Sequence, residues 1–317
     1  MVRYLLKRLF MAFVVVVLVM AFLGVLVHLV PGDPVKVILG PRADPQLSEI
    51  VRKQMNLDAP VATQVWDFIV NAFQGNLGQD FLSQLPVTRL IAGVLPHTVI
   101  LALASLGLAV LLGVPLGVFA ATHQNSILDR IVGIVSVSFI TMPPYVAGLF
   151  LLLIFSVKLD VLPAIGSGSF SDPVDYLKHL ALPAVALAVT WIGYLARLVR
   201  ASMLEVLNTN YVRTAHAFGV SERVVFYKYA LKNAIIPTVA VLGVGLGTLL
   251  GGAIFIEVIF TRPGLGSLIF GAIETRNYPI VRGGVLCVAV LFVLANLLAD
   301  LSYRFLDPRT RTELARA

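Results

Sequence analysis

Charged residues are scarce in this sequence. Only 13% of its 317 residues are Asp, Glu, Lys or Arg, whereas 58% are hydrophobic, and the mean hydropathy is +0.92. Soluble globular domains carry about 25% charged residues, so composition alone places the chain in a lipid bilayer. The net charge of +7 requires no nucleic-acid partner, because basic loops that face anionic lipid account for it.

Metal-binding and catalytic signals are also missing. The single cysteine, Cys287, excludes an intrachain disulfide, and the five histidines lie in different segments without a ligand spacing such as His-x-x-x-His. The sequence has no Gly-x-x-x-x-Gly-Lys-Ser/Thr phosphate loop, so the chain is not expected to bind ATP by that route. We therefore expect no metal site, no cofactor and no catalytic residue in this chain.

Long apolar runs, by contrast, recur along the whole chain. A helix needs about 20 apolar residues to cross the hydrocarbon core, and the sequence predicts an all-α membrane protein with six such spans at residues 9–30, 98–121, 131–157, 180–196, 235–259 and 280–301. Basic residues precede the first run, as in a secretory signal. However, the run is longer than a signal core and no small-x-small cleavage site follows it, so we interpret it as a spanning helix.

The distribution of Lys and Arg sets the expected orientation. Six crossings that start inside place both termini in the cytoplasm, and the inner segments then hold more Lys and Arg per residue than the outer ones. The expected organisation is a first helix at residues 1–30, an external loop at 31–97, a five-helix core at 98–303 and a cytoplasmic tail at 304–317. The core includes a cytoplasmic loop at 197–235.

The external loop is expected to contain two amphipathic helices. Asp44 before Pro45 predicts a helix start, and a second helix is predicted from residue 61 until Gly75-Asn-Leu-Gly78 ends it. Their apolar positions follow helical spacing: Leu47, Ile50, Val51 and Met55 in the first, and Val65, Phe68, Ile69, Ala72 and Phe73 in the second. The helices are either a cap over the bundle or part of a platform for an external partner.

Proline and glycine mark two features within the spans. Met142, Pro143 and Pro144 interrupt the third span, and the two missing backbone donors predict a bend or break, which is either a plain kink or a gate. Glycines spaced by four residues predict helices that approach closely, with a mobile seam as the alternative: Gly243, Gly247 and Gly251 in the fifth span and Gly113 and Gly117 in the second.

Ionisable residues within the spans lie near the span ends. Glu257, Arg282 and Asp300 are expected to snorkel or to pair at the interface, because a charge in the hydrocarbon costs about 3 kcal/mol or more. An ion- or proton-driven carrier would hold such groups nearer the midplane. That class is disfavoured here and is kept as an alternative.

A polar island separates the fourth and fifth spans. Asn208-Thr-Asn210 predicts a turn with capping residues, residues 211–218 predict two helical turns, and Gly219 predicts a left-handed stop. Ser221 is expected to cap a second helix that continues through Asn233. About 35 residues is long for an ordinary connection, and long ordered loops tend to be functional. The island is thus either a plain loop or a docking site for a cytoplasmic protein.

Two motifs in this island resemble a known family. They are similar to the glycine-centred cytoplasmic loop, the EAA loop, of ABC importer permeases of the dipeptide and oligopeptide branch. The two motifs are Tyr211-Val-Arg-Thr-Ala-His-Ala-Phe-Gly219 and Ala230-Leu-Lys-Asn-Ala-Ile-Ile-Pro237. Further matches follow in the family order: Pro31-Gly-Asp-Pro34, Leu57-Asp58 with Pro60, Gly75-Asn-Leu-Gly78, Glu257-Val-Ile-Phe260 with Pro263-Gly-Leu-Gly266, and Asp307-Pro-Arg309. The chain departs from the family pattern at four places. Arg213-Thr214 stands where the broad family has Glu-Ala, Phe218 where it usually has Lys, Tyr229 where it usually has His, and Asn277 where the branch often has Asp.

The resemblance implies a type I ABC importer permease fold with a cytoplasmic coupling helix, in a bacterial inner membrane. It implies a second permease, two ATPase subunits that use ATP and Mg, and an external solute-binding protein. The chain itself would not be an enzyme. The expected cargo is di- or oligopeptides, with glutathione, nickel complexes, opines and oligosaccharides as alternatives. A membrane enzyme or structural anchor is the remaining class. The coupling contact would lie on Tyr211, Val212, Arg213, Thr214, Ala215, His216, Ala217, Phe218, Gly219, Val220, Ser221, Glu222 and Arg223.

Overall fold

The computed structural model describes residues 2–29, 35, 44, 46, 49, 52 and 59–306. Within these ranges the chain is helical and forms no β-strand. The chain divides into two compact units, residues 1–98 with 263–293 and residues 99–262 with 294–317. Two helices, α5 (Val87–Thr122) and α14 (Tyr278–Leu306), contribute residues to both units.

The described helices account for the expected membrane spans. Five are long and apolar enough to cross a bilayer: α1 (Val2–Leu29), α5, α8 (Pro173–Leu207), α12 (Ile236–Ile259) and α14. The sixth span is a broken pair, Ile127–Thr141 and Pro144–Lys158, whose two parts meet at 104°. Both α5 and α8 extend well beyond their apolar runs, because their polar end turns continue the same backbone hydrogen-bond ladder. The expected six-span, all-α fold is confirmed.

The first unit contains α1, α4 (Val61–Phe73) and α13 (Leu265–Glu274). Helix α4 packs on α1 so closely that a Cβ at Gly24 would lie 2.4 Å from Cγ2 of Val65. Its Phe68 joins a buried apolar cluster with Met20 and Leu286. The predicted helix from residue 61 is therefore confirmed, although Phe73 on its predicted apolar face is exposed.

The other expected amphipathic helix lies almost wholly outside the described residues. Leu47, Ile50, Val51 and Met55 belong to the part of the chain that the structure does not describe. Of its expected start, Asp44 is described, and its Oδ1 accepts a hydrogen bond from the backbone N–H of Gln46 at 2.9 Å. The prediction of a helix there stays a prediction.

The second unit contains most of the helices. They are α6 (Ile127–Thr141), α7 (Pro144–Leu151), the π-helix η1 (Leu152–Lys158), α8, α9 (Asn210–Ala217), α10 (Glu222–Val224), the π-helix η2 (Val225–Ala230), α11 (Leu231–Ala234) and α12. Helix α8 is at the centre of this unit, and two thirds of its most apolar window is buried. A Cβ at Gly117 of α5 would lie 2.5 Å from the carbonyl oxygen of Ala196, and one at Gly113 would lie 2.9 Å from that of Ile192. The predicted close packing at these two glycines is confirmed.

The glycines of the fifth span do not form one packing stripe. A Cβ at Gly243 would clash with Cβ of Ala299 in α14 at 1.8 Å, whereas one at Gly251 would meet nothing within 4 Å. Gly247 is buried. Eight residues of α-helix rotate by about 80° beyond two full turns, so Gly243 and Gly251 face different directions. The prediction of a single seam is wrong for Gly251.

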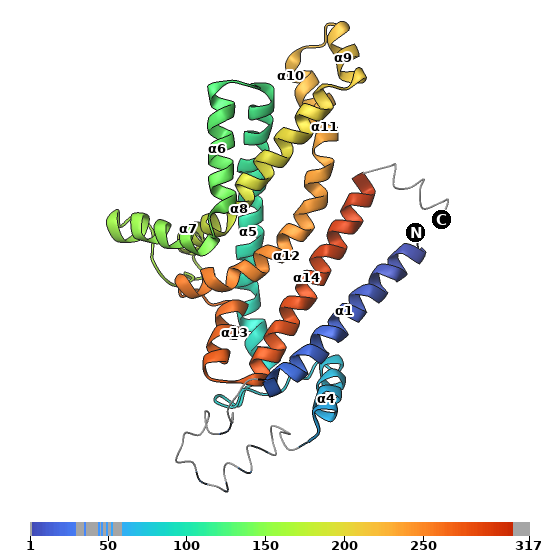
Figure 1. The fold of residues 1–317 in the computed structure, drawn as a ribbon. Helices are drawn as coiled ribbons and strands as arrows, with labels where there is room; N and C mark the ends of the chain where they lie inside the picture. The colour runs from blue at the N-terminus through green and yellow to red at the C-terminus, as the bar shows by residue number, and fades with distance from the viewer. Residues whose placement is uncertain are drawn as a thin grey trace. The chain divides into compact units, whose positions relative to one another are not determined.

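The third span breaks at Met142, Pro143 and Pro144, as their sequence predicts. Pro143 stands in an extended conformation before α7, and α7 crosses the end of α6 (Figure 1). The Oγ1 of Thr190 in α8 donates a hydrogen bond to the carbonyl oxygen of Met142 at 3.1 Å. This bond satisfies a carbonyl that the broken helix no longer pairs.

Candidate functional site

Helix α9 is held by a small apolar inner face. Val212 and Ala215 are buried and pack with Val225 of η2, together with Val206 and Leu207 at the end of α8. These side chains recur on one side of two helical turns, which is the spacing that an amphipathic helix requires. Val212 and Ala215 therefore anchor the helix, and they are not available to another protein.

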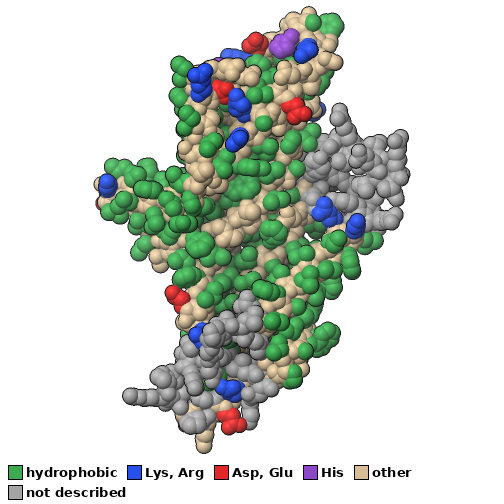
Figure 2. Space-filling model, viewed as in Figure 1, with side chains coloured by type: hydrophobic (Ala, Val, Ile, Leu, Met, Phe, Trp, Pro, Cys, Tyr) green, Lys and Arg blue, Asp and Glu red, His purple; other side chains and the backbone are tan. Residues whose placement is uncertain are grey.

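The opposite face of α9 is open. Phe218 exposes 83% of its surface, an unusual position for a large aromatic residue on a polar segment. Figure 2 shows Lys, Arg, His and acidic side chains gathered at the end of this unit that carries α9, with hydrophobic side chains covering the helices beyond it. The exposed members of the predicted contact set are Tyr211, Arg213, Thr214, His216, Ala217, Phe218, Gly219, Ser221, Glu222 and Arg223.

The end of α9 is a glycine-dependent stop. Gly219 has a φ of +74°, and its N–H donates to the carbonyl of His216 at 2.9 Å while the N–H of Val220 donates to that of Ala215 at 3.2 Å. This pair of bonds is the Schellman arrangement, which favours glycine because a Cβ is strained at positive φ. The predicted left-handed stop is confirmed.

The segment after α9 differs from the expected helix. Ser221 precedes α10, but its side chain makes no capping hydrogen bond, so that prediction is wrong. The residues up to Ala234 are helical in three pieces, of which η2 is a π-helix. Asn233 has another role: its Nδ2 donates to the hydroxyl of Tyr211 at 2.8 Å and ties α11 to α9. Both residues belong to the matched motifs.

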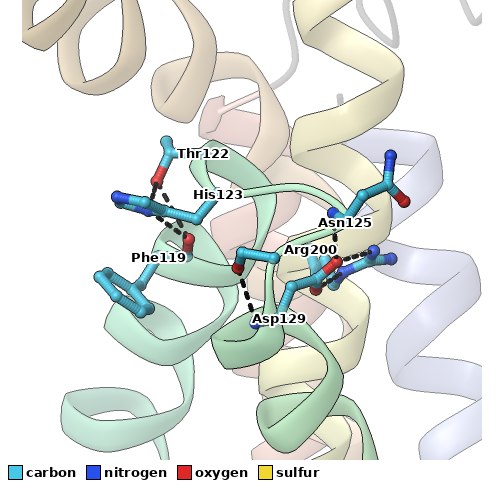
Figure 3. Close-up of polar contacts among 7 residues, drawn as sticks. Phe119, Thr122, His123, Asn125, Asp129 and Arg200 are labelled. Atoms are coloured by element: carbon cyan, nitrogen blue, oxygen red, sulfur yellow. Dashed lines mark hydrogen bonds and ion pairs between the residues drawn. The ribbon is translucent and has the colours of Figure 1, made fainter.

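A partly buried ion pair lies near the end of α8 that leads to α9 (Figure 3). Nε of Arg200 donates to Oδ1 of Asp129 at 2.6 Å, and Nη2 donates to Oδ2 at 2.8 Å. The same carboxylate accepts from the backbone N–H of Asn125, and the N–H of Asp129 donates to Oγ of Ser126. The pair joins the start of α6 to α8. Ser126 is the N-cap of α6, and a serine three residues before an acidic residue is the sequence signal of such a helix start.

Glu257 lies inside the protein. Glu257 and Arg262 are both fully buried, which excludes snorkelling of Glu257 and leaves the other expectation, pairing, with Arg262 as its charged neighbour. The N–H of Arg262 donates to the carbonyl of Glu257 at 2.8 Å across Thr261, whose φ is 46°. Nη2 of Arg262 donates to the hydroxyl of Tyr176 at 2.7 Å. Burial lowers the pKa of Arg262, and its interactions with Tyr176 and Glu257 partly offset this. The side chain of Asp300 is not described.

Asp80 organises the loop between α4 and α5. Its carboxylate accepts from the N–H groups of Leu82 and Ser83, from the Ser83 hydroxyl and from Nδ2 of Asn277. Burial would raise the pKa of Asp80, but the bonds from Ser83, Leu82 and Asn277 outweigh burial and hold the pKa below its ordinary value of 3.8. The loop is thereby fastened to the turn before α14.

This arrangement predicts an acid-sensitive contribution to stability. A carboxylate with a depressed pKa stabilises the fold above its unfolded pKa, and the contribution is lost as the pH falls through the folded pKa. Asp80→Ala should lower the free energy of unfolding by about 2 kcal/mol at neutral pH, and by less as the pH falls below 3.8. Thermal unfolding of the detergent-solubilised protein at several pH values would measure this. A deficit that stays constant with pH would contradict the role of the ionised group.

Comparison with known proteins identifies the family. The model of the binding-protein-dependent transport system inner membrane component matches residues 113–312, and the model of its N-terminal part matches residues 1–102. The chain is 40% identical over 315 residues to the glutathione transport system permease protein GsiC of Shigella flexneri serotype 5b, covering 98% of this chain and 99% of the relative. The chain belongs to the binding-protein-dependent ABC importer permeases of the peptide type.

Other relatives agree with this assignment. The GsiC protein of Escherichia coli strain K12 is 39% identical, with the same coverage of both chains. Among solved structures, the permease is similar to a chain of the inward-facing MetNI methionine ABC transporter, with a TM-score of 0.56, 19% identity and coverage of 69% of this chain and 96% of the other. A chain of an amino acid ABC transporter is similar to it with a TM-score of 0.53 and 18% identity, and the match covers 72% of this chain and 99% of the other. These two similarities show the shared fold.

Family membership has direct consequences for the permease. It is a multi-pass inner-membrane protein, and the ATPase activity of such transporters lies in separate subunits. The family works with an ATPase and a substrate-binding protein.

Proposed function

We propose that this permease forms half of the translocation path of an ATP-driven importer for short peptides, with glutathione as the first candidate cargo. The observation that carries the proposal is the 40% identity, over almost the whole chain, to a glutathione transport permease. Glutathione is itself a tripeptide, so this relationship is compatible with the expected peptide cargo. Nickel complexes, opines and oligosaccharides remain alternative cargoes, to be separated by competition in the uptake assay.

The proposed assembly has a second, similar permease, two ATPase subunits and an external solute-binding protein. Each permease would dock its α9 into a cleft of an ATPase subunit, and that subunit would bind ATP and Mg; we propose no cofactor for this chain. The exposed face around Phe218 and the anchored face at Val212 support this role for α9, because a coupling element must be open on one side and rigidly held on the other. Both termini would lie in the cytoplasm, on the same side as α9.

Reconstitution tests the proposal. Proteoliposomes that contain the complete complex, with the binding protein added outside and ATP inside, should accumulate labelled glutathione, whereas the purified chain alone should not. Excess unlabelled dipeptide, nickel chelate, opine or oligosaccharide identifies the preferred cargo by competition. Uptake by the chain alone, driven by a proton gradient without ATP, would replace the proposal with an ion-coupled carrier.

The break at residues 142–144 and the interface at Gly243 are proposed as moving parts of the path. The 104° bend and the clash that any side chain at Gly243 would produce support this, since both positions concentrate backbone irregularity or close helix contact. Gly247 is buried on the same helix. Gly251, which faces open space, is left out of this proposal.

A further inference from the structure

A groove of about 450 Å³ lies between α6 and α8 in the second unit. Three arginines line it: Arg130 of α6, and Arg197 and Arg200 of α8. Asp129 is the acidic residue among the described side chains of the lining, so the groove has an excess of two positive charges. A concave surface with one dominant sign of charge concentrates ions of the opposite sign. The groove is therefore suited to an anion.

The guanidinium groups of this groove are available to a ligand. Arg130 and Arg197 are exposed, and neither makes a hydrogen bond or an ion pair with the part of the chain that the structure describes. The side chain of Arg200 is 32% exposed, and it donates to Asp129 through Nε and Nη2. A guanidinium has five N–H donors, so three of them remain. The carboxylate of Asp129 holds Arg200 in place beside the groove (Figure 3).

The packing of α6 against α8 brings the three arginines to one place. Arg130 follows Asp129 directly in the chain, and Asp129 is bonded to Arg200. Arg197 precedes Arg200 by three residues, so the two lie on the same side of α8, one helical turn apart. Two arginines of one helix and one of its neighbour can thus approach the same anion.

The groove becomes mostly apolar with distance from the ion pair. Its further lining includes Val132, Gly133, Val137 and Ala196. A Cβ at Gly133 would meet nothing within 4 Å, so the space beside this residue is open. Val137 lies two helical turns beyond Arg130, roughly 10 Å along the axis of α6. A ligand that fills this groove has a charged group at one end and a hydrocarbon chain at the other.

The face of α6 beside the groove is suited to lipid. Ile131, Ile134 and Val135 are exposed, and α6 is the first half of the broken membrane span. Arg130 is in the first turn of α6, at the start of this span, where phospholipid headgroups meet the hydrocarbon. Phosphates and acyl chains are thus both expected beside this groove.

We propose that the groove binds an anionic phospholipid, whose phosphate lies on Arg130, Arg197 and Arg200 and whose acyl chain follows the apolar part of the groove. Arginine binds phosphate through paired N–H groups, and basic pockets between membrane helices suit headgroups with several negative charges. The two excess positive charges favour cardiolipin, which has two phosphates, over phosphatidylglycerol, which has one. The proposal goes beyond the proposed function, because it involves neither the cargo nor ATP.

The test is native mass spectrometry of the full chain in detergent, titrated separately with cardiolipin, phosphatidylglycerol and phosphatidylcholine of matched acyl chains. Affinity should decrease in that order. Arg130→Gln combined with Arg197→Gln should weaken cardiolipin binding about 25-fold, because each basic residue near an anionic lipid contributes about fivefold. Bound cardiolipin should also raise the unfolding temperature of the unmodified chain more than that of this double variant. Both arginines are exposed, so the variant is expected to fold.

A matched control separates the groove from the general positive charge of the protein. Arg213→Gln combined with Arg223→Gln removes the same charge from the same unit. Both residues are exposed and lie outside the groove lining. This control should bind cardiolipin with the affinity of the unmodified chain. An equal loss of affinity in the two double variants would overturn the proposal.

Three further outcomes would overturn it. Equal affinity for cardiolipin and phosphatidylcholine would show that charge does not contribute to binding. Displacement of cardiolipin by millimolar inorganic phosphate would indicate a site for a free anion. Loss of the cardiolipin adduct in the assembled transporter, with binding retained by the isolated chain, would show that another subunit occupies the groove. None of these measurements uses glutathione or ATP, so failure of this site and failure of the proposed function are distinguishable.

Discussion

Gly219→Val is expected to abolish uptake by the assembled importer while ATP hydrolysis continues. At a φ of +74° an L-residue costs about 1–2 kcal/mol, and a β-branched one is a rarer outlier still. The chain must either carry this strain or give up the bonds from the N–H groups of Gly219 and Val220 to α9. Losing them redirects the end of the helix that bears Phe218. Uptake and hydrolysis measured in the same proteoliposomes give the coupling ratio.

The matched control at this position is Gly219→Asn. A Cβ at residue 219 would meet nothing within 4 Å, so substitutions there differ in backbone preference and not in packing. Asn adopts the left-handed conformation more readily than other non-glycine residues, and it should keep most of the uptake, with Gly219→Ala in between. Equal losses in the Asn and Val variants would refute the conformational reason. Full uptake by Gly219→Val would refute the coupling role of α9.

Arg200→Ala is expected to destabilise the permease more than Asp129→Ala. The side chain of Asp129 is 6% exposed and that of Arg200 is 32% exposed. Removing Arg200 leaves the carboxylate of Asp129 without its bidentate partner, and the nearby charge of Arg130 offsets only part of this loss, so we expect a cost of about 3 kcal/mol, the lower end of the range for breaking a buried pair. Removing Asp129 leaves a guanidinium that reaches water, so the cost falls toward about 2 kcal/mol. The temperature of unfolding of the purified protein, followed by tryptophan fluorescence, ranks the two variants.

The double variant separates the stabilisation that comes from the ion pair from the stabilisation that each residue gains through its other contacts. Asp129→Ala combined with Arg200→Ala should lose less stability than the two single losses together, because neither charge is then left unpaired. Arg197→Ala is the control, since Arg197 is exposed on the same helix and lines the groove beside the pair. If Asp129→Ala proves the more damaging single change, then the capping bonds of Asp129, and not its charge, dominate the site.

Local features were predictable at the candidate coupling site. The stop at Gly219 follows from one residue's backbone freedom, and the helix before it follows from apolar spacing at Val212 and Ala215. Which of these residues are exposed could be known only from the fold. The sequence pattern assigned all thirteen contact residues one role, whereas their burial divides them into an anchoring face and an open face. Ser221 shows the limit of local rules: a serine at the start of a helix was not sufficient to make a cap.

Long-range pairs were not predictable. Arg200 and Asp129 are 71 residues apart, Arg262 and Tyr176 are 86 apart, and Asn277 and Asp80 are 197 apart. The burial of Glu257 was not predictable either, because the position of a residue along its span does not show which side chains surround it in the fold.

The amino-acid sequence by itself determined the membrane class, the number of spans, the break at Pro143 and the stop of α9, because apolar run length, missing backbone donors and the freedom of glycine act within one or two helical turns. Tertiary structure alone decided which glycines touch a neighbouring helix, which charged residues pair, and which side of α9 is exposed. Such contacts depend on how helices rotate and pack against one another, and no spacing along a single helix encodes that rotation.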